Sequence, residues 1–256
     1  MIKVKINEKY FKLFEQYTHS IPVIYSTLEG QYEGELYVDK EDDPQVAILF
    51  TPFAFHYVAG NAEMSNVTEV IDEIIFKQYL LESEQKEAIV FSPNDKWNKV
   101  LDDVFKRYNG IKDKRMIFHL NREKYNEQKN SKKVNSDMDN RISFEKEQGS
   151  QKKYPVSRIY LEQKCVSFCS GFMLGKGHAE IDVSTDEKYR GNGYAKESAF
   201  TLINELLNSG IEPDWCTWPY RVESQKLACA LGFEIADEIP AYIWVEDECG
   251  KIGQSK

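Results

Sequence analysis

The residues with the clearest chemical potential lie between positions 178 and 195. A stretch of alternating character, 180–185, precedes a segment with two glycines, Gly191 and Gly193, and apolar residues recur at helical spacing from Ala195 onward. This order predicts a strand, a glycine-containing loop and the first turn of a helix. Unpaired N–H groups and the positive end of the helix dipole meet at such a turn, and glycine lets a ligand approach the backbone. The pattern favours a phosphate or pyrophosphate site, with a plain tight turn as the alternative.

Other phosphate and metal motifs do not match. No Gly-Lys-Ser/Thr follows the loop, as a Walker loop requires, and the third glycine of the dinucleotide fingerprint is absent. Cys165, Cys169 and His178 lack the spacing of a zinc site, and no second cysteine pair follows. We therefore expect no metal cofactor.

Two carboxylates stand two residues apart in the predicted strand 178–184. Because side chains alternate across a strand, Glu180 and Asp182 should share one face. Either carboxylate can act as a general base, directly or through water, and Glu180 is our first candidate. His178 is a further candidate. The alternatives are solvated carboxylates or cross-strand ion pairs, and a structural histidine.

The segment Arg190-x-x-Gly193-x-Ala195 resembles the Arg/Gln-x-x-Gly-x-Gly/Ala signature of the GNAT superfamily of acyl-CoA-dependent N-acyltransferases. Residues 180–185 and the later Leu-Gly-Phe at 231–233 resemble the subgroup that includes the zwittermicin A resistance acetyltransferases. The close match covers about residues 165–235, and the element order resembles the family over 116–246. The resemblance implies acetyl-CoA as cosubstrate and direct attack of an amine on the thioester, without a covalent enzyme intermediate.

The resemblance also implies roles for individual residues. The strand would diverge from its neighbour and leave a slot for the thioester. Backbone groups at the end of the strand would pair with the pantetheine arm: Val183, Ser184 and Thr185. Backbone N–H groups of the next loop would hold the pyrophosphate: Arg190, Gly191, Asn192, Gly193, Tyr194 and Ala195. The enzyme would position the amine, remove its proton and stabilise the oxyanion through a strand N–H group.

The sequence departs from the family where the leaving thiolate is protonated. Many members carry a tyrosine four residues before the glycine of Leu-Gly-Phe, and Ala228 stands there. Ser224, one helical turn away, is our candidate for a hydrogen bond to the sulfur, with a helix cap or surface hydroxyl as the alternative. Arg221 stands where many relatives have asparagine, either to contact the CoA phosphates or as an exposed side chain.

Composition narrows the class of protein. The 256 residues include 33 Lys and Arg against 42 Asp and Glu, for a net charge of −9, which argues against a general nucleic-acid binder. The mean hydropathy is −0.56, and no apolar run approaches the length of a membrane helix. The start lacks the apolar region of a secretory signal, and the five cysteines are odd in number. We expect a reduced, cytoplasmic protein that binds neither nucleic acid nor membranes.

Hydrophobic periodicity predicts an α/β (α+β) protein, and the resemblance implies a GNAT-like mixed central sheet flanked by helices. We expect two GNAT-like domains, a degenerate one at 1–115 and the acetyltransferase domain at 116–256, with the polar stretch 121–153 as a linker, exposed helices or a lid. Segment 53–57, where a duplicated loop would stand, lacks the signature, so we expect no CoA there. The predicted strands are 34–37, 46–50, 88–91, 158–162, 164–172, 178–184, 215–218 and 242–245. The predicted helices begin after Asn66, Pro93 and Gly193, and a further one ends at Leu231.

These observations lead to one main functional hypothesis. We expect an N-acetyltransferase whose partners are acetyl-CoA and a primary amine, most simply that of a small molecule. Two alternatives stay open: a non-catalytic acyl-CoA-binding or regulatory module, and acetylation of a protein or peptide amine. The sequence also leaves open whether the protein forms a homodimer.

Overall fold

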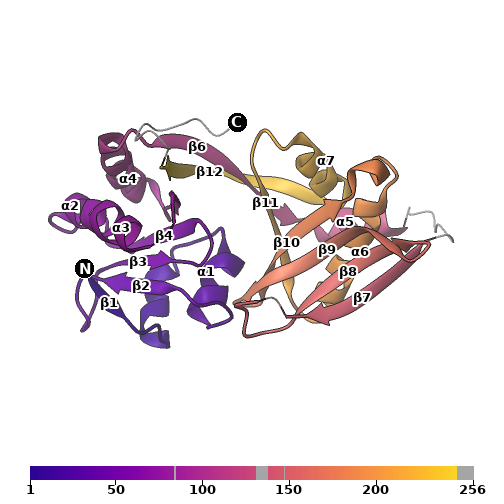
Figure 1. Ribbon diagram of the computed structural model, residues 1–256, viewed down its shortest axis with the longest axis horizontal. Helices are drawn as coiled ribbons and strands as arrows, with labels where there is room; N and C mark the ends of the chain where they lie inside the picture. The colour runs from indigo at the N-terminus through magenta and orange to yellow at the C-terminus, as the bar shows by residue number, and fades with distance from the viewer. Residues whose placement is uncertain (84, 131–137, 147, 247–256) are drawn as a thin grey trace. The chain divides into compact units, whose positions relative to one another are not determined.

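The chain divides into two compact units in the computed structural model, which describes residues 1–83, 85–130, 138–146 and 148–246 (Figure 1). The N-terminal unit comprises Met1–Ser20, Thr27–Lys114 and the chain from Ile239 onward. The C-terminal unit comprises Ile21–Ser26 and Arg115–Glu238. The chain therefore enters the C-terminal unit briefly at Ile21–Ser26, passes into it again between Lys114 and Arg115, and returns between Glu238 and Ile239.

The N-terminal unit contains a mixed sheet. Its strand order is β1-β2-β3-β4-β5-β12, in which β4 and β5 are parallel and the other recorded pairs are antiparallel. The strands are β1 (Ile2–Val4), β2 (Glu35–Val38), β3 (Val46–Phe50), β4 (Phe55–Gly60), β5 (Glu87–Phe91) and the end of β12 (Phe233–Val245). The helices are the 3₁₀-helix η1 (Glu8–Phe14), α2 (Val67–Asp72), the π-helical η2 (Glu73–Tyr79), α3 (Leu80–Glu82) and α4 (Asp95–Arg107).

Helix α4 shows how local sequence builds this unit. Asn94 caps it, since its side-chain oxygen accepts hydrogen bonds from the N–H groups of Lys96 and Trp97. The apolar residues at helical spacing are buried against β3 and β4, as predicted: Trp97, Val100, Leu101, Val104 and Phe105. The fully buried strand β3 supplies Ile48 and Phe50 to the same core.

In the C-terminal unit the strands follow the order β6-β11-β10-β9-β8-β7. Strands β10 and β11 are parallel, and the other recorded pairs are antiparallel. The strands are β6 (Ile111–Leu120), β7 (Asp139–Glu145), β8 (Tyr154–Leu161), β9 (Lys164–Gly175), β10 (His178–Thr185) and β11 (Glu212–Thr217). The helical segments are α5 (Arg122–Asn130), η3 (Glu187–Tyr189), α6 (Tyr194–Asn208) and α7 (Val222–Ala230), while α1 (Ile21–Leu28) contributes its first six residues.

Helix α6 covers one face of this sheet. It packs against β8, β9 and β10, and its buried residues include Ala199, Leu202, Ile203 and Leu206, as the periodicity predicts (Figure 1). The opposite face of the sheet is therefore left to carry the polar side chains of β10 and β11.

Several expectations about elements need correction. Helix α2 begins after Asn66, as predicted, but Asn66 is left-handed, with φ 61°, and its side chain makes no capping bond. Residues 55–57, where a duplicated loop would stand, belong to β4. Strands β4 and β6 were not among the predicted strands. Within the polar stretch 121–153, the described residues form α5 and β7, while residues 131–137 and 147 lie outside the described part of the chain.

The predicted fold class is confirmed by the mixed sheet and its flanking helices. None of the helices in the described residues has the length and apolar character needed to cross a membrane.

Candidate active site

Strand β10 leaves its parallel neighbour at Glu180. Its pairing with β11 runs from His178 opposite Glu212 to Glu180 opposite Asp214, whereas its pairing with β9 continues to Thr185. A register shift against β9 falls between Glu180 and Ile181, which marks a bulge at the point of divergence. The last five residues of β10 thus have no recorded pairing with β11, and binding of the pantetheine arm there stays a prediction.

The two candidate carboxylates lie on the face away from the helices. Ala179, Ile181 and Val183 contact the apolar core, so the alternate residues Glu180 and Asp182 point to the opposite face. Glu180 is only 6% exposed, whereas Asp182 is exposed. The same strand therefore offers one buried and one accessible carboxylate.

Glu180 sits in a chain of hydrogen bonds from two other strands. The Cys216 thiol on β11 contacts Glu180 Oε1 at 2.6 Å. Arg115 on β6 donates to Cys216 Sγ from Nε at 3.2 Å and from Nη2 at 2.9 Å. Burial raises the pKa of Glu180 to about 7, although Arg115 and Cys216 oppose this rise. Glu180 is therefore a carboxylate that exchanges a proton near neutral pH.

The neighbouring ionisable groups are arranged around the same face. His178 Nδ1 lies 3.0 Å from Asp214 Oδ1, and this hydrogen bond raises the pKa of His178. Partial desolvation raises the pKa of Asp182, while the Val183 N–H group and the charge of Arg221 oppose the rise. His178 is thus held by Asp214, which leaves Glu180 as the buried proton acceptor of this cluster.

The loop after β10 presents backbone rather than side chains. Gly191 and Gly193 have φ of 78° and 83°, and a Cβ placed on either would meet nothing within 4 Å. Gly193 is the N-cap of α6, and as a glycine it has no side chain to cap the helix. Arg190 Nε donates to the carbonyl of Thr185 at 3.4 Å, which ties the loop to the end of β10. Binding of a pyrophosphate by the first-turn N–H groups stays a prediction.

The remaining predicted cofactor-binding residues lie at the end of β10, in the loop before α6 and in the first turn of α6. Ser167 Oγ donates to the carbonyl of Ser184 at 3.0 Å and shares a hydrogen bond with Thr185 Oγ1 at 2.8 Å. The Asn192 side chain donates to the carbonyls of Tyr189 and Arg190, each at 3.1 Å. Tyr194 and Ala195 are the first, half-buried residues of α6.

Helix α7 carries Ser224, the candidate for a hydrogen bond to the leaving sulfur. Trp215 Nε1 donates to Ser224 Oγ at 3.2 Å. Because an indole N–H is only a donor, the serine keeps its own proton for another acceptor. Ala228 is fully buried in the apolar core, and Arg221 is exposed.

Arg115, Cys216 and Asp214 were not among the predicted site residues. Alternation along 212–218 places Asp214, Cys216 and Trp218 on one face, which is a signal that could have flagged the first two. Arg115 lies on β6, a strand absent from the predicted set.

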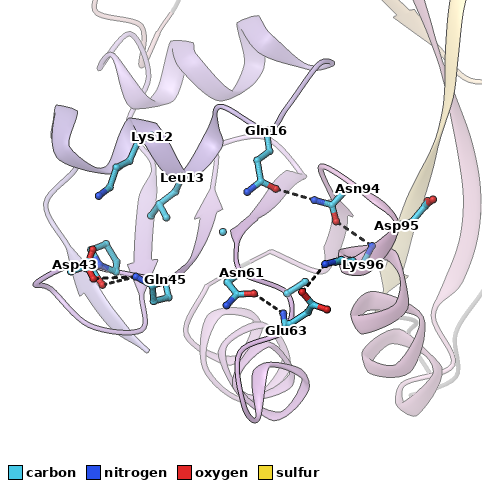
Figure 2. Close-up of a pocket in the computed structure, with 13 residues that line it drawn as sticks. Lys12, Leu13, Gln16, Asp43, Gln45, Asn61, Glu63, Asn94, Asp95 and Lys96 are labelled. Carbon is cyan, nitrogen blue, oxygen red and sulfur yellow. Dashed lines mark hydrogen bonds and ion pairs between the residues drawn. The ribbon is translucent and has the colours of Figure 1, made fainter.

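A separate pocket of about 750 Å³ lies in the N-terminal unit, at the end of β4 and the start of α4 (Figure 2). Strand β4 pairs in parallel with β5 over its first three residues, much as β10 pairs with β11. Figure 2 shows that the polar side chains here bind one another: Asn94 donates to Gln16, and Lys96 pairs with Glu63. The absence of CoA binding in this unit stays a prediction.

No group of three or more His, Cys, Asp or Glu side chains within the described ranges is arranged to hold a metal ion.

Comparison with known proteins decides the family. The GNAT acetyltransferase family model matches residues 12–242. This chain belongs to the GNAT acetyltransferase family. The members of this family are acyl-CoA-dependent acyltransferases that use acetyl-CoA as cosubstrate, so the predicted family and enzyme class are confirmed.

Relatives of this GNAT protein match along most of its length. The uncharacterized N-acetyltransferase YdfB of Bacillus subtilis (strain 168) is 24% identical over 264 residues, covering 94% of each chain. A GCN5-related N-acetyltransferase-like protein from Streptococcus suis 89/1591 has a TM-score of 0.63 at 22% identity, covering 92% of this chain and 97% of that one. A tandem GNAT protein from the clavulanic acid biosynthesis pathway has a TM-score of 0.62 at 7% identity, covering 92% and 89%. The two structures support the fold alone.

Proposed function

We propose that the C-terminal unit transfers the acetyl group of acetyl-CoA to a primary amine of a small molecule by direct attack. The observation that carries this proposal is the position of Glu180. It is a buried carboxylate, with a pKa near 7, at the residue where β10 and β11 stop pairing. A general base works best when its pKa lies near the working pH.

The cosubstrate would lie along the free side of β10 and end at the loop before α6. Backbone groups of Val183, Ser184 and Thr185 would pair with its pantetheine arm. The first-turn N–H groups of α6 and the 190–193 loop would hold the pyrophosphate. Because Gly191 and Gly193 leave open space around their Cα atoms, a phosphate can approach the backbone without steric conflict.

In the reaction, the amine nitrogen forms a bond to the thioester carbonyl carbon and its proton passes to Glu180. A backbone N–H group of β10 stabilises the oxyanion, the C–S bond then breaks, and the thiolate takes a proton. Ser224 is our candidate for a hydrogen bond to the departing sulfur, because its hydroxyl proton is not used by Trp215, and the thiolate takes its proton from solvent. The exposed Asp182 would attract a cationic amine toward Glu180.

The first experiment tests cosubstrate binding by thermal shift with acetyl-CoA, desulfo-CoA and ATP. At ligand about a hundredfold above Kd, linkage adds about 2.7 kcal/mol and should raise Tm by about 5–10 °C. Gly193→Asp places a carboxylate at the pyrophosphate site and should abolish the shift with both CoA ligands.

Gly177→Asp is the matched control, because Gly177 also has a positive φ, 76°, with nothing within 4 Å of a Cβ. It lies in the β9–β10 turn, so it should bear the same backbone strain and still bind. Equal loss of binding in both variants would contradict the assigned pyrophosphate site.

The second experiment tests catalysis. Purified protein is screened for release of free CoA thiol with small amines and with lysine peptides, alongside Glu180→Gln and Asp182→Asn. We expect turnover of a small amine that falls by about 10²–10⁴-fold in Glu180→Gln. Preference for the peptides would favour the protein-amine alternative. Binding without turnover of any amine would favour the non-catalytic module.

A further inference from the structure

We propose that Arg115 and Cys216 act together as positioning residues that orient the Glu180 carboxylate at the divergence of β10 and β11. The inference deepens the proposed function and rests on it, because it assigns the support for the base of that reaction. Three neighbouring strands supply the three groups: β6 carries Arg115, β11 carries Cys216 and β10 carries Glu180.

The direction of this hydrogen-bond chain follows from the chemistry of its members. An arginine guanidinium only donates, so Cys216 Sγ must accept from Arg115 Nε and Nη2. The thiol proton then points away from the arginine and toward Glu180 Oε1. Proton donation thus runs in one direction, from Arg115 to Cys216 and from Cys216 to Glu180.

This chain of hydrogen bonds gives the two carboxylate oxygens of Glu180 different roles. Oε1 accepts the thiol hydrogen bond whether Glu180 is ionised or protonated. Oε2 is then the oxygen that takes the proton of the amine. The hydrogen bond at Oε1 fixes the Glu180 rotamer and leaves Oε2 to accept the proton. A fixed position matters because misplacement of a catalytic group by about 1 Å can lower the rate about a hundredfold.

The guanidinium is itself held in place. Arg115 Cζ lies 5.0 Å from the centre of the Trp218 ring, so the guanidinium packs over an aromatic face while its Nε and Nη2 groups contact Cys216 Sγ. Its positive charge offsets the repulsion that Asp214 and Asp182 exert on an ionised Glu180. The charged and titratable groups beside Glu180 on these strands thus include Arg115, Cys216, Asp214 and Asp182, together with His178, which is paired with Asp214.

The decisive experiment follows the ionisation of Glu180 directly and needs no acceptor amine. Protein labelled with ¹³C at the glutamate carboxyl carbon is titrated by NMR, and the Glu180 signal is identified by its loss in Glu180→Gln. We expect a midpoint near 7 in the wild-type protein. Cys216→Ala and Arg115→Met should each raise the midpoint by about one pH unit, because each removes a group that favours the carboxylate.

Conservative and matched variants separate positioning from general damage. Cys216→Ser keeps a donor and should stay closer to the wild-type midpoint than Cys216→Ala. Cys229→Ser changes an exposed cysteine on α7, and Arg122→Met removes an exposed arginine that pairs with Glu212. Both controls should leave the midpoint unchanged.

A midpoint unchanged in Cys216→Ala and in Arg115→Met would overturn the inference. If either Cys216→Ala or Arg115→Met fails to fold, as judged by its amide spectrum, the midpoints of the other variant and of Cys216→Ser test the inference. With an accepted amine in hand, the acidic limb of kcat/KM should move with the NMR midpoint. An NMR shift without any acetyl transfer would support the hydrogen-bond chain and refute the proposed reaction, so the two failures are distinguishable.

Discussion

The buried histidine of the N-terminal unit should make the stability of this protein depend on pH. His56 on β4 is fully buried, with its ring 5.0 Å from that of Phe50 and 5.1 Å from that of Tyr79. Neither ring nitrogen makes a hydrogen bond of normal geometry to any described residue. Burial lowers the pKa of His56 to about 3, and the Phe55 backbone offsets this only in part.

The size of the effect follows from linkage. The unfolded chain binds a proton at His56 below its ordinary pKa of 6.5, while the folded chain does not until about 3. Stability is therefore lost as the pH falls below 6.5. Each unit of pH within this window costs about 1.4 kcal/mol, which amounts to about 2 kcal/mol between about pH 7.5 and 5.

Glu180 acts in the opposite direction. Its pKa is raised from 4.5 to about 7 in the folded protein, so the folded state binds the proton more tightly. It gains stability as the pH falls through 7, by about 2 kcal/mol over the same range. In the wild-type protein the two contributions nearly cancel, so only variants reveal them.

The assay is urea unfolding of the wild type, His56→Gln, Glu180→Gln and the double variant at about pH 7.5 and 5. Relative to wild type, His56→Gln should gain about 2 kcal/mol of unfolding free energy on going to the lower pH, and Glu180→Gln should lose about as much. The double variant should match the wild type in its pH dependence. If His56→Gln keeps the pH dependence of the wild type, the reasoning is refuted.

Three further predictions concern the fold. Asn94→Ala should lower the unfolding free energy by about 1 kcal/mol, measured by urea unfolding, because it removes the cap of α4 and the bond to Gln16. Gly232→Ala should lower Tm more than Gly210→Ala. Both glycines have positive φ, but only at Gly232 would a Cβ meet backbone, 2.5 Å from Tyr125 N. Equal losses of Tm in the two variants would contradict this contact. Truncation after residue 238 should make the N-terminal unit susceptible to limited proteolysis, because the truncation removes the part of β12 that pairs with β5. Protection of α4 from cleavage to the same degree as in the full chain would contradict the need for this strand.

Much of the local structure could be predicted from the sequence. Helix α4 has its cap at Asn94 and its apolar residues at helical spacing, and both signals act within a few residues. Strand β3 is apolar throughout and is fully buried. The glycine loop before α6 was also predictable, because its conformation depends on residues that cannot be replaced without strain.

Strands β4 and β6 show where local signals fail. Strand β4 reads Phe-His-Tyr-Val-Ala-Gly, with a histidine that is polar by type but fully buried in the structure. Strand β6 carries charged residues over its first half, and its pairing with a neighbour such as β11 identifies it as a strand. The partner strand supplies the hydrogen bonds that define a strand, and that partner lies about a hundred residues away in the chain.

The sequence by itself determined the family signature, the phosphate-type loop and the pair of carboxylates on one strand, because each of these is written within a few consecutive residues. The tertiary structure decided the rest of the site. Arg115 and Cys216 are 101 residues apart, and Cys216 and Glu180 are 36 apart, so only the strand order β6-β11-β10 brings them together. It also decided which carboxylate is buried, and burial is the physical reason that the pKa of Glu180 lies near 7.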